Sequence, residues 1–385
     1  MKIRKPNYFN EFKCISSKCE DTCCAGWGIV IDDESYKRYV SVDGEFGEEL
    51  RSKIINEGGE NIFILNGDRC SFLNNDNLCD IYNELGPDSL CYTCKQYPRY
   101  FEEFGSLREI GISLSCPEVA RIILRNSEKF KFELIENDEE VKRYNDINPM
   151  LYMNLMKCRN VVFDILQNRD LNLNVRCILS LIFVNEIQEK IDKNKIEEIK
   201  YITNKYIDTK FIYDSINYID KYKGKVNKKY TNIREVLEVF KNLKHITPND
   251  PLALNDVLRY FWQNEDDINV YFDIHESFDN YYKDKLHQFE QILIYFVFRY
   301  FMKAVFDYDA LAKIKIALVS YIMIRELCIV RYLENKEFTD GDMVDIAHTY
   351  SKDIEHLEEN IEKLEELFET NNVFNIEELT ITLFN

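Results

Sequence analysis

The stretch from Tyr308 to Asn335 reads YDALAKIKIALVSYIMIRELCIVRYLEN. Apolar residues recur in it at intervals of three and four, which is the spacing of a helix that packs into a core. The preceding stretch, Asp279–Asp307, is similarly apolar and predicts a second long helix. We therefore expect these two helices to form the centre of a mostly α-helical fold.

The same spacing continues through residues 150–385, which we interpret as one helical domain. Residues Ser351–Thr370 predict an acidic amphipathic helix with its isoleucines and leucines on one stripe. Pro248 and Pro251 indicate one boundary inside this domain. These patterns favour a helical bundle for the larger part of the chain.

The apolar stretches are too short to cross a membrane. The two strongest, Ile292–Phe298 and Ile316–Ile324, are each followed by arginine, and neither reaches the roughly 20 uninterrupted apolar residues of a spanning helix. No apolar stretch follows the charged start Met1–Pro6, so the sequence shows no secretory signal. We expect a cytoplasmic protein that contacts no membrane.

Cysteine is concentrated in one third of the chain. Nine of the twelve cysteines fall within the first 116 residues, whereas all five histidines lie beyond residue 244. The three others, Cys158, Cys177 and Cys328, stand singly in helical sequence and are expected to be small buried residues. We therefore interpret residues 1–125 as a cysteine-rich module that a polar connector, 126–149, joins to the helical domain. The nine cysteines are Cys14, Cys19, Cys23, Cys24, Cys70, Cys79, Cys91, Cys94 and Cys116.

These nine thiols are more typical of a metal centre than of disulfides. Disulfides are rare in the cytosol, where clustered cysteines bind metal or carry out redox chemistry. Structural zinc sites usually show paired CxxC motifs, often with histidine, but this module has one CxxC and no histidine nearby. An all-thiolate set suits an iron–sulfur cluster or tetrahedral zinc, and the spacing leaves both open.

The adjacent pair Cys23-Cys24 bears on the number of centres. Neighbouring side chains tend to diverge, so these two more easily serve two centres than one. Nine thiolates also exceed what one four-coordinate site uses. Either two centres form, or some of the cysteines only surround the ligands.

Short elements are expected around the cysteines. Gly28–Ile31 and Leu107–Leu114 are predicted to be strands, and the turn Asn66-Gly67-Asp68 predicts a hairpin that presents Cys70. Cys116 stands before Pro117-Glu118, so we expect it at the N-cap of a helix, where the helix dipole favours a thiolate. The predicted fold class is therefore α+β and mostly helical.

Five blocks of residues surround the cysteines in a fixed order. They are Phe12-Lys-Cys14 with Cys19-Glu-Asp-Thr-Cys23-Cys24-Ala-Gly-Trp27, then Cys70-Ser-Phe-Leu73, Cys79-Asp-Ile-Tyr82, Cys91-Tyr-Thr-Cys94-Lys-Gln-Tyr-Pro-Arg99, and Leu114-Ser-Cys116-Pro-Glu118. These blocks resemble the opening of the flagellin lysine-N-methylase family. The cysteine-rich part is also similar to small CxxxCC-type proteins regarded as zinc- or iron-chelating. The chain length and the long helical part favour the methylase family.

The resemblance implies transfer of methyl groups from S-adenosylmethionine to lysine side chains of flagellin, with a [4Fe-4S] cluster involved; zinc is the alternative metal. The radical S-adenosylmethionine signature is CxxxCxxC, whereas here Cys19-x3-Cys23 continues directly with Cys24. The only Gly-x-Gly, Gly26-Trp-Gly28, precedes a strand rather than following one, so it does not match the loop of a Rossmann methyltransferase. Any S-adenosylmethionine is therefore expected to bind unconventionally, near the cluster.

Methyl transfer to a lysine requires further side chains besides the cysteines. A lysine ammonium must lose a proton before it attacks a methyl group. Glu109, Glu118 and Tyr97 are candidates for a catalytic role, although Glu118 also suits a surface charge in a first helical turn. Trp27 is a candidate for holding the cofactor, since aromatic rings attract cations. Arg99 is a second candidate, since it can pair with a carboxylate, and the alternative for it is an exposed position. The alternative for the aromatic residues is packing around the cysteines.

The charge of the chain limits its partners. Aspartate and glutamate number 68 against 49 lysines and arginines, for a net charge of −19. Such a balance disfavours nucleic acid and suits a lysine-bearing protein such as flagellin. The alternative function is an iron–sulfur or zinc protein of redox or structural role without methylase activity. The oligomeric state is not defined by the sequence.

Overall fold

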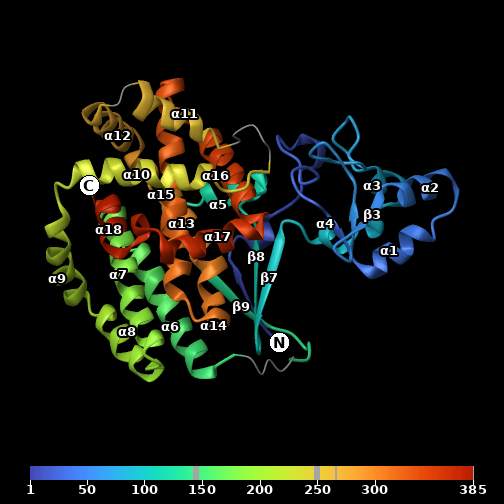
Figure 1. Ribbon diagram of the computed structural model, residues 1–385. Coiled ribbons are helices and arrows are strands. Elements are labelled where there is room, and N and C mark those ends of the chain that lie inside the picture. The colour runs from blue at the N-terminus through green and yellow to red at the C-terminus, as the bar shows by residue number, and fades with distance from the viewer. Residues whose placement is uncertain (142–146, 247–251, 265–266, 385) are drawn as a thin grey trace.

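The computed structural model describes residues 1–141, 147–246, 252–264 and 267–384. It has a large helical body and a smaller lobe that contains α1–α4 (Figure 1). The expected boundary at Pro248–Pro251 lies outside the described residues. The fold is mostly α-helical with short strands, as the sequence predicts.

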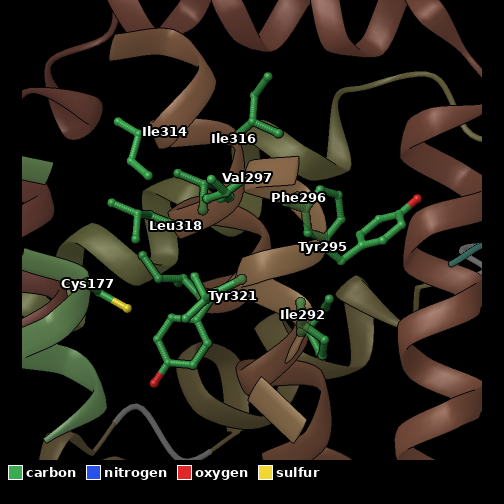
Figure 2. Close-up of a cluster of buried hydrophobic side chains, with 14 of the residues drawn as sticks. Cys177, Ile292, Tyr295, Phe296, Val297, Ile314, Ile316, Leu318 and Tyr321 are labelled. Carbon is green, nitrogen blue, oxygen red and sulfur yellow. The ribbon is translucent and has the colours of Figure 1, made fainter. Parts of the chain in front are cut away.

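Helix α15 (Ala310–Asn335) is the centre of the body, and every residue from 312 to 330 is buried. Helix α13 (His287–Tyr300) packs against it, and Figure 2 shows their side chains interdigitating around Val297, Leu318 and Tyr321. The long helix predicted over Tyr308–Asn335 is confirmed, because α15 covers all but its first two residues. No helix of the described ranges combines the length and apolarity that a membrane span requires.

The buried charges of α15 are paired. Arg325 donates to Asp279 at 2.7 Å, and Glu326 lies 3.0 Å from the ring nitrogen Nε2 of His275. Both partners belong to α12 (Ile268–Tyr282), which packs on α15. A charged residue is tolerated in a core when a partner satisfies it, so these ions fix where α12 sits on α15.

The remaining helices complete the bundle around this pair. Helices α6 and α7 pack against each other, and α18 packs on α7 and α10. The remaining helices of the body are α5 (Pro117–Leu124), α6 (Pro149–Leu166), α7 (Leu173–Asp192), α8 (Ile199–Ile207), α9 (Thr209–Ile219), α10 (Val226–Lys241), α11 (Leu254–Arg259), α14 (Ala304–Asp307), α16 (Asp340–Glu355), α17 (Glu358–Thr370) and α18 (Ile376–Phe384).

Two predicted helices are each broken in the structure. Asp279–Asp307 is not one helix: a 3₁₀ turn at Lys283–Lys285 separates α12 from α13, and a second one at Phe301–Lys303 separates α13 from α14. Lys285 donates to Asp340 at 2.8 Å, at the first residue of α16, and this ion pair holds the turn. Residues 283–285 are polar, as residues on the outer face of a helix also are, so the spacing of apolar residues did not predict the break.

The predicted helix Ser351–Thr370 is broken after Glu355, where α16 ends, and α17 begins at Glu358. The amide of Asn360 donates to the backbone carbonyls of Asp353, at 3.1 Å, and Lys244, at 2.8 Å. The Asn360 side chain therefore donates a hydrogen bond to a carbonyl in the last turn of α16, where carbonyls have no partner within the helix.

A four-stranded sheet lies beside the body in the order β7-β8-β1-β9. Strand β1 runs parallel to β8 and antiparallel to β9. Strand β9 lies inside the polar segment that the sequence marks as a connector, and it pairs with β1 from Lys2↔Glu136 to Pro6↔Phe132. The bounds are β1 (Lys2–Pro6), β7 (Arg99–Phe104), β8 (Leu107–Ile112) and β9 (Phe132–Glu136).

The lobe has its own elements and its own small core. Strands β2, β3 and β4 form one sheet in the order β2-β4-β3, and β5 and β6 form the predicted hairpin, with Leu65 opposite Cys70. The bounds are β2 (Val30–Ile31), β3 (Ile54–Glu57), β4 (Glu60–Phe63), β5 (Leu65–Asn66), β6 (Arg69–Cys70), α1 (Asp33–Val40), α2 (Gly44–Ser52), α3 (Asp80–Leu85) and α4 (Tyr92–Gln96).

Hydrophobic packing separates two cores. The lobe core is built from Ile29, Tyr39, Phe63 and Phe72 with their neighbours. Residues at both ends of the N-terminal third, among them Tyr8 and the buried face of α5, belong instead to the core of the helical body. The cysteine-rich part of the chain is therefore shared between two cores.

Candidate metal and cation site

Five of the nine cysteines lie in the lobe core, and we call them the lobe cysteines. Cys70 and Cys91 are buried in that core, and three others pack against it. The backbone N–H of Cys70 donates to the carbonyl of Cys24 at 2.7 Å, which ties the hairpin to the first cysteine loop. The lobe cysteines are Cys24, Cys70, Cys79, Cys91 and Cys94.

The other four lie outside the lobe core, on the chain segments before and after the lobe, and we call them the junction cysteines: Cys14, Cys19, Cys23 and Cys116. Cys116 belongs to the core of the body. Burial raises the pKa of Cys116 to about 11, and the nearby thiols of Cys19 and Cys14 add to that rise. Cys14 and Cys116 are likewise among the groups that raise the pKa of Cys23.

The adjacent pair Cys23-Cys24 spans the two sets. Their thiols hydrogen-bond each other, which raises the pKa of Cys23 and lowers that of Cys24 to about 7. A second pair behaves in the same way, because a hydrogen bond with Cys94 lowers the pKa of Cys91. In each pair the hydrogen bond favours the thiolate of one cysteine, and the thiolate is the form that binds metal.

Three cysteines stand at the N-caps of helices. Cys79 precedes α3, Cys91 precedes α4 and Cys116 precedes α5, so the N-cap predicted for Cys116 is confirmed. Backbone N–H groups of the first turn hydrogen-bond each of these sulfurs and favour the thiolate. Sulfur ligands stabilised by backbone N–H groups are typical of metal–thiolate centres.

Within the described residues, no group of three or more cysteine, histidine or carboxylate side chains is arranged to hold a metal ion. The thiols form pairs instead, as the contacts of Cys23 with Cys24 and of Cys91 with Cys94 show. An iron–sulfur cluster binds each cysteine to a different iron, so its ligands lie farther apart than those of one ion.

Three aromatic rings meet at the junction. The ring centroids of Trp27 and His356 are 5.1 Å apart, those of Tyr97 and His356 are 5.9 Å apart, and those of Trp27 and Tyr97 are 6.0 Å apart. Trp27 precedes β2, Tyr97 follows α4, and His356 follows α16. Two of the three rings are sequence candidates, and the structure brings them together.

Ser115 anchors this group from inside. Its hydroxyl oxygen lies 2.9 Å from Nε2 of His356, 3.1 Å from the hydroxyl of Tyr97 and 2.8 Å from the hydroxyl of Ser113. Ser115 is 1% exposed and directly precedes Cys116. Two of the three rings, Tyr97 and His356, are therefore connected by hydrogen bonds to the residue before the N-cap of α5.

Ion pairs fasten the first cysteine loop to the body around these rings. Both Nη atoms of Arg121, in α5, donate to Glu20 at 2.7 Å. Lys352, in α16, donates to Asp21 at 2.7 Å and to the carbonyl of Thr22 at 3.2 Å. The loop that carries Cys19 and its neighbours is thus held at fixed points of two helices.

The acidic candidates lie in different surroundings. Glu109 is 3% exposed, and its carboxylate accepts both Nη groups of Arg159 and one of Arg4, so it is a member of a buried ion cluster. Glu118 pairs with Arg121 at 3.0 Å, beside the junction. Arg99 is exposed, with its guanidinium 5.3 Å from the ring centroid of Phe12.

His356 is the residue that sequence reasoning missed. It lies 241 residues after Ser115, in a segment that periodicity assigned to the interior of a helix. Burial lowers its pKa to about 4, so the imidazole is uncharged at neutral pH. His356 lies between α16 and α17 with acidic residues around it, and no motif in the sequence distinguishes it as a site residue.

Comparison with known proteins gives the class. A family model described as the C-terminal domain of FliB lysine N-methylase matches residues 159–382, more than half of the chain. The chain therefore belongs to the FliB lysine N-methylase family, and the resemblance seen in the cysteine blocks is confirmed.

Curated relatives agree. The chain is 30% identical over 131 residues to the flagellar biosynthetic protein FliU of Salmonella muenchen, covering 32% of this chain and 78% of FliU. It is also 30% identical over 131 residues to the lysine-N-methylase of Salmonella typhimurium. That match covers 32% of this chain and 33% of the enzyme, so it spans only a third of the enzyme's length. No solved structure matches.

Proposed function

We propose that this chain is a cytoplasmic protein-lysine N-methyltransferase that transfers methyl groups from S-adenosylmethionine to flagellin. The observation that carries the proposal is the family match over the helical body, residues 159–382. The flagellar name of one relative and the lysine-N-methylase name of another support flagellin as the substrate. The net charge of −19 favours a substrate that offers lysines.

We further propose that the N-terminal cysteines hold a [4Fe-4S] cluster. The donor set fits such a group, because all nine side chains are thiols, and three of them are N-capping residues with backbone N–H groups on the sulfur. When bound, the cluster supplies iron coordination and electron-transfer chemistry at the edge of the helical body. The lobe cysteines and the junction cysteines form two separate candidate ligand sets, each with at least four members.

The side chains of the chain itself do the positioning. The ion pairs of Glu20 with Arg121 and of Asp21 with Lys352 hold the first cysteine loop against α5 and α16. The aromatic rings of Trp27, Tyr97 and His356 pack against one another at the junction. Glu118 is the candidate carboxylate that lies closest in sequence to a cysteine, two residues after Cys116.

The alternative is a metal-binding protein without methylase activity. The lobe cysteines favour it, since they share a core of their own, and four of them lie in or directly before the short elements β6, α3 and α4. A structural zinc ion in the lobe would order these elements outright. Under this alternative the chain leaves flagellin unmodified.

One experiment separates the proposals. The chain is purified without oxygen, its iron, zinc and acid-labile sulfide are measured, and its visible spectrum is recorded. It is then incubated with purified flagellin and S-adenosylmethionine, and lysine methylation is read by mass spectrometry, with a reaction lacking the donor as the control. Iron and sulfide together with methylated lysines support both proposals. Zinc without sulfide, even after cluster reconstitution, would contradict the proposed [4Fe-4S] cluster. Unmodified flagellin in a reaction with the cluster-loaded chain would contradict the proposed methylase activity.

A further inference from the structure

The three rings at the junction, Trp27, Tyr97 and His356, form what we call the junction triad. All three side chains are partly exposed, although they come from segments far apart in the chain. Their interplanar angles are 39°, 50° and 83°, so the rings present faces in different directions rather than stacking. Trp27 packs against the lobe core and Tyr97 against the core of the body, so each ring is buried on one side and partly exposed on the other.

Most of the polar atoms of the triad make hydrogen bonds. The indole Nε1 of Trp27 donates to the carbonyl of Cys23 at 2.9 Å. Ser115 holds the hydroxyl of Tyr97 and Nε2 of His356. Among the described residues, Nδ1 of His356 is a buried atom without a hydrogen-bond partner. A ligand at the triad therefore meets this nitrogen and the π-faces of the rings, and the electron-rich face of an aromatic ring attracts a cation.

The triad itself carries no charge at neutral pH. Burial lowers the pKa of His356 to about 4, with Lys352 and Arg299 contributing, and burial raises the pKa of Tyr97 well above its usual value. Both nearby cations are already paired, Lys352 with Asp21 at 2.7 Å and Arg299 with Glu355 at 3.3 Å. The rings and the paired ions beside them therefore present no free positive charge that would repel a cation.

We propose that the junction triad binds an onium cation through its ring faces, next to Cys23 and Cys116. Two reactants of methyl transfer share this chemistry: the sulfonium of S-adenosylmethionine and the ε-ammonium of the acceptor lysine. The inference rests on the proposed function for the identity of the cation. It assigns to Trp27 and Tyr97 a part in binding, and it adds His356 to them.

The triad is tested by charge selectivity. Calorimetric titration of the chain purified without oxygen compares S-adenosylmethionine with S-adenosylhomocysteine, the neutral thioether that lacks the methyl group. A second pair compares flagellin with flagellin whose lysines are acetylated. We expect the charged member of at least one pair to bind more tightly, and that pair identifies the cation. Equal affinity within both pairs, or no binding in either, overturns the proposal.

Substitutions locate the selectivity. Tyr97→Leu and His356→Leu are expected to weaken binding of the charged ligand by roughly three- to thirtyfold, the range of a lost cation–π contact. Tyr97→Phe keeps the ring and is expected to bind within about twofold of the parent chain. The matched control is Tyr82→Leu, which removes an exposed tyrosine from α3. Unchanged affinity in the leucine variants contradicts the inference.

Two further measurements keep the outcomes distinct. Circular dichroism shows whether each leucine variant is folded, and Trp27→Phe, which keeps a smaller ring, replaces any variant that is not. Charge-selective binding lost in the variants, in a chain that leaves flagellin unmodified, supports the triad and rejects the methylase. Methylation that proceeds with unchanged ligand affinity in the variants rejects the triad and leaves the methylase standing.

Discussion

Nε2 of His356 lies 2.9 Å from the hydroxyl oxygen of Ser115, across 241 residues of sequence. This hydrogen bond joins the break between α16 and α17 to the residue before the N-cap of α5. It lets one end of the helical body set the position of Cys116. Ser115 is therefore a positioning residue of the junction.

Replacing Ser115 with alanine is expected to destabilise the chain by about 2 kcal/mol, because it leaves His356 and the hydroxyls of Ser113 and Tyr97 without a partner. Urea unfolding measures the change in free energy. The matched control is Ser320→Ala, a buried serine that accepts one hydrogen bond, from Tyr350. We expect that control to cost about 1 kcal/mol, and equal costs would show that the Ser115 network adds nothing.

The stability of the chain is expected to fall on acidification through His356. Its pKa is about 4 in the folded chain against an ordinary 6.5, so the unfolded state takes up the proton first. This contribution is fully present above pH 6.5 and is lost as the pH falls to about 4, by up to about 3 kcal/mol. Unfolding of the parent chain and of His356→Gln is compared at several pH values. The variant should lose less stability across this window, and parallel curves would contradict the assignment.

Gly26 allows the first cysteine loop to approach the body. Its φ is +89°, and a Cβ there would lie 2.3 Å from Cγ2 of Ile246. Gly67 has a similar φ of +68° with open space around it, which makes Gly67→Ala the control. Both substitutions pay about 1–2 kcal/mol for the left-handed backbone, and Gly26→Ala is expected to lose a further 1–3 kcal/mol or so from overpacking. Thermal unfolding checks this difference, and Ile246→Ala should relieve it.

Glu109 forms a buried ion pair with Arg159, and replacing Glu109 tests whether its carboxylate has a structural or a catalytic role. Glu109→Gln is expected to cost about 3–5 kcal/mol in unfolding free energy, since Arg159 is 0% exposed and would lose its charge partner. Glu136→Gln, which breaks an exposed pair with Lys2, should cost less than about 1 kcal/mol. A stable Glu109→Gln variant that lost only methyl transfer would instead make Glu109 catalytic.

The two cysteine sets predict two independent losses of metal. Double substitution of Cys70 and Cys79 by serine is expected to remove the metal of the lobe and to spare the junction, and Cys14 with Cys19 the reverse. Metal and sulfide analysis of each variant measures what remains. Cys177→Ala, a buried thiol far from both sets in sequence, should keep the full content. Complete loss in both double variants would show a single centre that draws on both sets.

Local signals predicted much of this fold. The spacing of apolar residues predicted α15, and a cysteine before a proline predicted the N-cap of α5. The hairpin at Gly67 followed from turn chemistry. Each of these features depends on residues close together in sequence, where periodicity and capping act directly.

Features that depend on distant partners were missed. The turn after α12 is held by an ion pair with Asp340, and β9 pairs with β1 although its own sequence is polar. His356 belongs to the same class, because only the packed structure places it on Ser115. The cysteines themselves were evident, but their division between two cores required the fold.

Strands β1 and β7 belong to one sheet, although the chain between them, residues 7–98, makes up the lobe and its two connections. Forming the sheet therefore closes a long loop, and the entropy of that closure opposes folding. Crosslinking thiols inside the loop through a metal centre shortens the free chain that has to be closed. Loading the cysteines is thus expected to strengthen the pairing of β1 with β8, so that the sheet and the helices packed on it gain stability from an event in another core.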